Sequence, residues 1–218
     1  YTGCDYNGDL RDPAFVDSLP DVDTVIHLAA FNSTKNFYST PFSVIDSIVT
    51  PTMNLLKRYP NAHFVYAGSS EEYAGTVNRG WASIPTPEDV ILRFHNIYGP
   101  GQQNHFIPEF IERIQQGDNR LYGWDDTRSF CYIDDAVKLT IAVIEQKNQI
   151  VNIGSPEESK IVDVANIIVD LLALPDDFEL WDSPAGSTPR RAPDLTKLNK
   201  FVPDFEWTDL RTGLKTCL

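Results

Sequence analysis

The sequence predicts an α/β fold with an open, doubly wound parallel sheet. Two short apolar runs, Thr24 to Leu28 and Phe64 to Ala67, are rich in β-branched and aromatic residues and are typical of buried strands. A long helical stretch from Phe42 to Arg58 separates them. This order makes a strand–helix–strand unit, whose connection is right-handed in nearly all parallel sheets.

The composition is that of an ordinary soluble globular protein. The chain has 218 residues, of which 42% are hydrophobic and 22% charged, enough for one large domain or two small ones. A net charge of −13 weighs against nucleic acid and anionic membrane surfaces as partners. No apolar run approaches the roughly 20 residues of a membrane helix, and the N-terminal residues do not resemble a signal peptide. Three widely spaced cysteines favour a reducing, cytoplasmic setting.

The first elements are predicted from turn and helix signals. A charged turn at 7–12 precedes a short helix from Pro13 to Leu19, with proline early, where a helix tolerates it. Pro51 lies inside the long helix and is expected to kink it or end its first half. The apolar residues available for the core face of that helix are Val44, Ile48, Met53, Leu55 and Leu56.

The stretch from His63 to Gly75 is where we expect the chemistry. Its apolar strand runs directly into Gly68, two serines and two glutamates. Ligands of open α/β sheets lie beyond the carboxyl ends of the strands, so these side chains are candidates for a site. The alternative is an ordinary solvated turn, since glycine and serine are common in loops.

The alternation of strands and helices then breaks. Residues 75–89 show no helical period, yet Val90 to Phe94 is again a buried strand. Neighbouring parallel strands need a crossover of about a dozen residues or more, usually a helix. Either this strand pairs differently or a segment is missing from the chain as given. No glycine-rich turn precedes Gly8 either, although a doubly wound sheet normally opens with one.

The second half of the chain contains further helices and one clear strand, Ile150 to Ile153. Asp134 is predicted to N-cap its helix. The predicted helices are Ile107 to Gln116, Asp134 to Gln146, Ile161 to Leu174, Thr196 to Phe201 and Asp209 to Leu218.

Six stretches, in order, resemble the extended short-chain dehydrogenase/reductases, the NAD-dependent nucleotide-sugar epimerases and dehydratases. The stretches are Gly8 to Asp12, Val25 to Ala30, Ser69 to Ala74, Leu92 to Pro100, Arg128 to Ala136 and Arg191 to Asp194. Each is weak alone, but their common order is specific. The resemblance implies a Rossmann-type sheet with a smaller C-terminal substrate-binding α/β subdomain. It assigns 1–98 plus 129–153 to the dinucleotide-binding part, and 99–128 plus 154–218 to the substrate-binding part.

The resemblance also implies the site residues, an NAD cofactor (with NADP possible) and a homodimer. Ser69 would be the catalytic hydroxyl, and Glu71 falls where dehydratases and decarboxylases carry an active-site carboxylate. The remaining residues implied are Asp9, Leu10, Leu28, Ala29, Ala30 and Phe94 for the cofactor, and Asn96, Arg128 and Arg191 for the diphosphate of a nucleotide sugar.

Alternatives remain for several of these residues. A guanidinium binds phosphate through two parallel hydrogen bonds, which suits the two arginines to a diphosphate. Arg190 adjoins Arg191, however, so a surface salt bridge or a slip of one residue competes with that role. Trp124, in a Gly/Asp loop, is a candidate for contact with a base or sugar, although such aromatics more often pack in a core. The four histidines lack metal-ligand spacing, so no metal site is predicted.

Two departures from the family affect the predicted reaction. No tyrosine has a lysine four residues on, and no glycines have the spacing Gly-x-x-Gly-x-x-Gly. Both motifs belong at the two places where the fold already indicates a gap, so we expect that the chain as given omits those segments. The implied activity is epimerisation or dehydration through a transient keto-sugar. The alternatives are a non-catalytic nucleotide-sugar-binding relative and a keto-sugar reductase.

Overall fold

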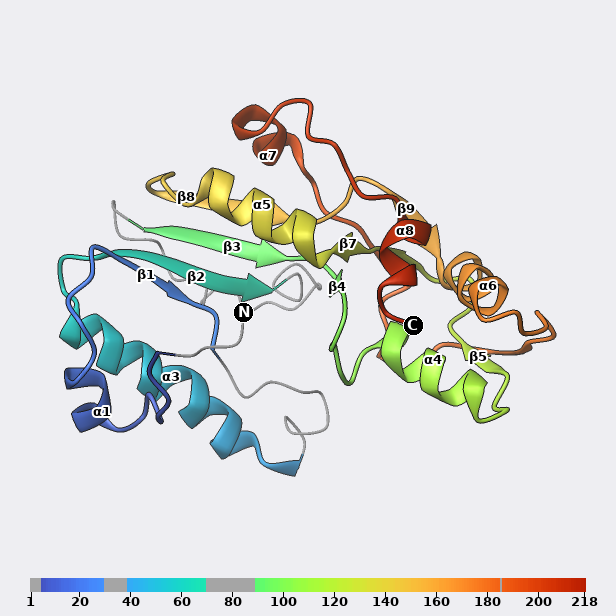
Figure 1. Cartoon of the computed structure of the whole chain (residues 1–218), viewed down its shortest axis with the longest axis horizontal. Helices are drawn as coiled ribbons and strands as arrows, with labels where there is room; N and C mark the ends of the chain where they lie inside the picture. Colours follow the sequence, from blue (N-terminus) through green and yellow to red (C-terminus); the bar gives the residue numbers. More distant parts are fainter. Residues whose placement is uncertain (1–4, 30–38, 70–88, 185) are drawn as a thin grey trace. The chain divides into compact units, whose positions relative to one another are not determined.

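The computed structural model describes residues 5–29, 39–69, 89–184 and 186–218 (Figure 1). The chain forms two compact units, Tyr1–Ala67 and Gly68–Leu218. Both contain parallel strands connected through helices, which confirms the predicted α/β class. None of the described helices combines the length and apolarity needed to cross a lipid bilayer.

The first unit is built on a pair of parallel strands. Strand β1 (Thr24–His27) pairs with β2 (His63–Ser69) from Thr24 opposite His63 to His27 opposite Tyr66. Helix α3 (Pro41–Arg58) connects them, and the short helix α1 (Pro13–Asp17) packs against α3. Asp12 caps α1, because its side chain accepts a hydrogen bond from the backbone nitrogen of Ala14 at 2.9 Å.

Of the two effects predicted for Pro51, a kink or an end of the helix, the structure rules out the second. Helix α3 continues through Pro51 to Arg58. Proline removes one helical hydrogen bond, yet Val44, Pro51 and Leu55 are the buried residues of α3, and tertiary packing of this kind supplies most of the stability of helices in proteins. Packing of the buried face therefore outweighs the missing bond.

The burial predicted for the first unit is partly wrong. Strand β1 alternates between exposed and half-buried residues instead of being buried throughout, and Ile26 is 48% exposed. Ile48 and Met53 of α3 are exposed as well. Among the described residues β1 pairs only with β2, so one edge of it is uncovered. The core of this unit consists of Val16, Leu55, Tyr59 and Phe64.

The second unit contains another parallel pair, β3 (Val90–Phe94) and β8 (Gln149–Ile153), with Val90 opposite Gln149 and Phe94 opposite Ile153. Figure 1 shows helix α5 (Ile133–Val143) running along this pair. Tyr132, not Asp134, is the N-cap residue of α5, so the predicted cap is wrong. Asp134 lies in the first turn instead, where its charge favours the positive end of the helix dipole.

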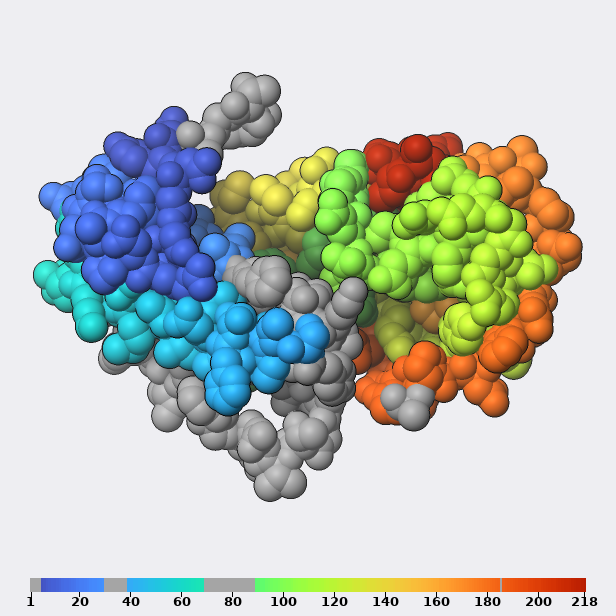
Figure 2. Space-filling model, turned by 90° about the horizontal axis from the view of Figure 1, so that it is seen from below, coloured from blue at the N-terminus to red at the C-terminus, as the bar shows by residue number. Residues whose placement is uncertain are grey.

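The largest core of this unit lies among three helices: α4 (Phe106–Gln115), α6 (Ile161–Leu171) and α8 (Leu210–Lys215). Figure 2 shows the yellow-green residues of α4 and β5 beside the red residues of α8 on one face. Tyr98 joins this core, and its hydroxyl donates to the carbonyl of Leu210 at 3.3 Å. A Cβ at Gly213 would come within 2.1 Å of that hydroxyl, so only glycine lets α8 approach so closely.

Several short strands complete the second unit, and the sequence did not predict them. Strands of two or three residues are too short to show a hydrophobic period. They form three small sheets: β4 (Ile97–Tyr98) with β7 (Cys131–Tyr132), β5 (Arg120–Tyr122) with β10 (Glu179–Trp181), and β6 (Thr127–Ser129) between β11 (Arg190–Arg191) and β9 (Glu158–Lys160). Helix α7 (Thr196–Phe201) follows β11 and contacts β8.

Candidate functional site

The carboxyl ends of β1 and β2 carry several residues predicted for the cofactor and for catalysis. The two strands are parallel, so Leu28 and Ala29, which follow β1, lie at the edge of the pair where β2 ends in Ser69. Leu28 and Ala29 are both exposed. Ala30 and Glu71 lie outside the described residues. A ligand can therefore reach the end of β1, where the small side chain of Ala29 leaves room for it.

Asp9 and Leu10 are held against helix α3. The side chain of Asn54 donates to the carbonyl of Leu10 at 3.0 Å and to that of Arg11 at 3.1 Å. Arg11 donates to Asp9 at 2.6 Å and reaches Asp46 of α3 at 3.3 Å. The hydrogen bonds from Arg11 lower the pKa of Asp9 to about 2. Asp9 is therefore an exposed, ionised carboxylate that can accept further hydrogen bonds.

Arg128 and Arg191, the arginines predicted to bind a diphosphate, come from neighbouring strands. Strands β6 and β11 are parallel, with Arg191 directly opposite Arg128. Residues opposite each other in a sheet project from the same face. On the other side of β6, Ser159 of β9 is opposite Arg128. One face of the sheet thus carries a row of Arg191, Arg128 and Ser159, and no sequence motif pointed to the serine.

The neighbouring Arg190 projects from the opposite face. It makes an ion pair with Glu158 at 2.7 Å, and its side chain is 70% exposed. The Thr127 hydroxyl donates to the same glutamate. The surface salt bridge that competes with a phosphate role is thus formed by Arg190, while Arg191 is in register with Arg128.

The guanidinium of Arg128 is fixed by an ion pair that the sequence pattern did not reveal. Its Nη2 lies 3.3 Å from the carboxylate of Asp126, and both side chains are largely buried. Its Nη1 donates to the carbonyl of Thr127 at 2.8 Å, and Ser183 donates to Asp126 at 2.8 Å. These contacts orient Arg128 before any ligand binds.

Asn96 ties the end of β3 to strand β6. Its φ is +41°, a left-handed conformation that asparagine tolerates better than most residues. Its side-chain amide donates to the carbonyl of Ser129 at 3.0 Å, and its own carbonyl accepts from Cys131 at 3.2 Å. An asparagine amide has two hydrogens, so one bond does not exhaust its donors. The three residues predicted for the diphosphate, Asn96, Arg128 and Arg191, are therefore all grouped around β6.

The sequence motifs also did not point to His95, which packs beneath the segment that carries Arg191. His95 is 2% exposed, and a Cβ on Gly154 would lie 3.0 Å from the His95 Cβ and 2.9 Å from Pro193. Asn152 donates to the carbonyl of Asp194 at 2.9 Å.

Burial lowers the pKa of His95. The charges of Arg191 and Arg93 lower it further, and a hydrogen-bonding interaction with Asn152 opposes the shift. A neutral His95 therefore packs beside the site.

We expect the protein to lose stability as the pH falls below about 6.5, the pKa of an unperturbed histidine. In that range His95 takes up a proton more readily in the unfolded chain than in the folded one, so the unfolded state is favoured. His95 contributes at most about 1.4 kcal/mol per pH unit to the free energy of unfolding. Urea unfolding between pH 7.5 and pH 5.5 would measure it. A His95→Gln variant with the pH dependence of the wild type would contradict this.

Tyr122 of β5 and Trp181 of β10 form an exposed pair of aromatic rings. The rings of Tyr122 and Trp181 are 5.6 Å apart, and Gly123 donates to the carbonyl of Trp181 at 2.9 Å. Trp124, the aromatic that the sequence suggested, is also partly exposed. Such rings can stack on a planar ligand group. Trp181 was missed because its strand is only three residues long.

In the part of the chain that the structure describes, no three His, Cys, Asp or Glu side chains gather where they could hold a metal ion.

Comparison with protein families matches the chain to the NAD dependent epimerase/dehydratase family over residues 4–89 and 88–154. A UDP-N-acetyl-alpha-D-glucosaminuronate decarboxylase from Bacillus cytotoxicus is 30% identical over 249 residues, covering 88% of this chain and 74% of that protein. A dTDP-4-dehydro-6-deoxy-D-allose reductase from Streptomyces bikiniensis is 24% identical, covering 93% of this chain and 75% of that protein.

Solved structures show the same fold. The RMD protein of Pseudomonas aeruginosa complexed with NADPH matches with a TM-score of 0.80 at 20% identity, covering 97% of this chain and 86% of the other. The UDP-glucose 4-epimerase of Thermotoga maritima with UDP-glucose gives a TM-score of 0.80 at 20% identity, covering 97% and 82%. These matches confirm the predicted Rossmann-type fold.

Proposed function

Because this chain belongs to the NAD dependent epimerase/dehydratase family, we propose that it binds a nucleotide-diphosphate sugar and serves an NAD(P)-dependent conversion through a transient keto-sugar. The observation that supports this most directly is the row formed by Arg128 and Arg191, in register on one face of a small sheet. Two arginines in register on neighbouring strands suit the two phosphates of such a substrate. Asn96 adds an amide donor beside them.

The described residues fit part of a dinucleotide cofactor. The exposed backbone at Leu28 and Ala29 leaves room for a ligand at the end of β1, and the ionised Asp9 can accept a hydrogen bond from an adenine amino group. Phe94, half-buried at the end of β3, is the cofactor residue proposed in the second unit. When bound, the cofactor supplies a hydride acceptor and donor.

The roles proposed for the chain's own residues in the reaction are few. Ser69 would hold the reacting sugar hydroxyl, and Glu71 would take or give a proton at carbon. The arginine row and Asn96 would hold the diphosphate and so position the sugar. Residues 1–98 plus 129–153 would bind the cofactor, and 99–128 plus 154–218 the substrate.

We also propose that a crossover segment carrying the tyrosine and lysine is missing between β2 and β3. The alignment with the decarboxylase runs over 249 residues, more than the 218 of this chain, so that relative has residues at positions this chain lacks. The family match divides at 88–89, next to the start of β3. Mass spectrometry of the protein isolated from its source would test this, and a mass of 24.6 kDa would rule it out.

Titration calorimetry tests the binding function directly. We expect UDP or dTDP to bind with measurable heat, and NAD(H) or NADP(H) to bind as well. Absence of affinity for all of these would contradict the proposal. Binding without turnover would favour the non-catalytic relative, which the absence of Tyr-x-x-x-Lys supports. A consumed, rather than recycled, reduced cofactor would favour the keto-sugar reductase, the activity named for the Streptomyces relative.

A homodimer in the cytoplasm completes the proposal. Helix α3 leaves a stripe of apolar side chains exposed at helical spacing: Phe42, Ile45, Val49 and Met53. A second copy of the chain could cover this stripe, because a two-fold dimer brings the same surface of both subunits together. Sedimentation equilibrium would show whether the mass is that of one chain or two.

A further inference from the structure

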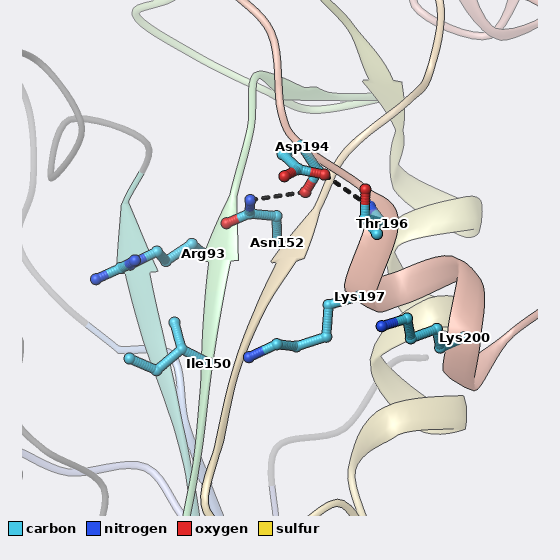
Figure 3. A pocket seen from close by; sticks show the side chains of 7 residues that line it. All are labelled: Arg93, Ile150, Asn152, Asp194, Thr196, Lys197 and Lys200. Atoms are coloured by element: carbon cyan, nitrogen blue, oxygen red, sulfur yellow. Dashed lines mark hydrogen bonds between the residues drawn. The ribbon is translucent and has the colours of Figure 1, made fainter.

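A cavity of about 480 Å³ lies in the second unit, where strands β3 and β8 meet the segment leading into helix α7 (Figure 3). Its lining residues are Arg93, Ile150, Asn152, Asp194, Thr196, Lys197 and Lys200. None of the residues proposed for the cofactor or the nucleotide sugar lines it. The cavity is therefore separate from the residues proposed for the cofactor and the nucleotide sugar.

The lining carries an excess of positive charge. Lys197 and Lys200 contribute two cations, against the single carboxylate of Asp194, and Arg93 also lines the cavity. Asp194 accepts a hydrogen bond from the backbone nitrogen of Thr196 at 2.8 Å, and its bonds with Thr196 lower its pKa, so it stays ionised. The chain as a whole has a net charge of −13. A concave surface of opposite sign to the whole protein attracts anions selectively.

The two lysines are placed by helix α7. They are three residues apart, which puts them on one side of the helix, and Leu198 anchors the helix in the core. Figure 3 shows both side chains extending from α7 toward the strands, with Lys197 reaching toward Ile150. Among the residues that the structure describes, neither lysine makes an ion pair, whereas Lys160 is paired with Asp125 at 2.6 Å. Their charges are thus available to a ligand.

We propose that this cavity binds a small anion that carries phosphate. Lysine ammonium groups bind phosphate as point charges, and an arginine can add a forked pair of hydrogen bonds. The volume lies within the range of small-molecule sites, and Ile150 gives the organic part of a ligand an apolar contact. This proposal does not rest on the proposed function, because it involves different residues.

Calorimetry with inorganic diphosphate tests the proposal. Saturating UDP is added first to occupy the arginine row, and the titration is done at low and at physiological salt. We expect the double variant Lys197→Gln/Lys200→Gln to bind diphosphate about tenfold more weakly than the wild type, since each exposed charge pair contributes modestly. Affinity should also fall with rising ionic strength. Lys215→Gln, which changes an exposed lysine of α8, is the matched control and should bind like the wild type.

Several results would overturn the proposal. Equal diphosphate affinity in the wild type and the double variant would do so, as would no binding to the wild type at low salt. Competition by chloride at the same concentrations as diphosphate would show a non-selective surface and overturn it too. Circular dichroism checks that the double variant is folded. If the wild type does not bind UDP but binds diphosphate through Lys197 and Lys200, the proposed function alone is contradicted.

Discussion

Restoring the crossover segment should raise turnover of a nucleotide sugar by about 10²–10⁴-fold over the 218-residue chain, the usual contribution of one general acid/base. The chain has no tyrosine with a lysine four residues on, so it lacks the group that the family resemblance assigns to this step. The corresponding segment of the Bacillus cytotoxicus decarboxylase can be inserted at residues 88–89, where the family match divides. Product formation is followed by NMR.

The matched control is the same insertion with its tyrosine replaced by phenylalanine. This protein has the restored crossover but lacks the acid/base group, so its turnover should fall back toward that of the 218-residue chain. If the original chain is as active as the extended one, the proposed omission and the role of the missing tyrosine are both wrong.

Arg128→Gln and Arg191→Gln are each expected to weaken UDP binding by about 10- to 100-fold. Each change removes charge-assisted hydrogen bonds to phosphate, which contribute about 1.5–3 kcal/mol. Arg128→Gln also leaves the largely buried Asp126 without its ion pair, so the stability of this variant must be measured separately. Titration calorimetry gives both affinities directly.

Arg190→Gln is the control for this pair. Arg190 projects from the opposite face and is paired with Glu158, so UDP affinity should change less than about threefold, the scale of an exposed ion pair. Uridine, which has no phosphate, should bind all three variants like the wild type. Equal losses from Arg190→Gln and Arg191→Gln would show that the arginine row is not the diphosphate site.

Much of the fold could be predicted because its longer elements carry a clear local signal. The strand from Val90 to Phe94 and the helix from Thr196 to Phe201 have the predicted bounds, and α4 begins one residue from its predicted start. Burial was harder to predict. A run such as Thr24 to Leu28 is apolar on both faces, but the pattern does not say what covers each face.

The candidate site depends more on tertiary structure than the fold elements do. Short motifs pointed to Arg128 and Arg191. Their position opposite each other on one face of the sheet depends on two strands that are too short to predict from the sequence. Asp126, His95 and Trp181 have no motif, since an ion pair, a buried ring and a stacked ring depend on which segments meet. The predicted N-cap of α5 was wrong for a similar reason, because the sequence does not distinguish an aspartate in the first turn of a helix from one at the N-cap.

The register of the two-residue strand β11 decides whether Arg190 or Arg191 lies opposite Arg128. Its register is set where the backbone nitrogen of Thr127 donates to the carbonyl of Pro189 at 2.9 Å, and Pro189 has no N–H with which to extend the ladder. If loss or gain of one residue in the preceding loop shifted this pairing by one position, Arg190 would lie opposite Arg128 and Arg191 would project from the other face. Ligand preference in this fold can therefore change by insertion or deletion, with no substitution of a charged residue.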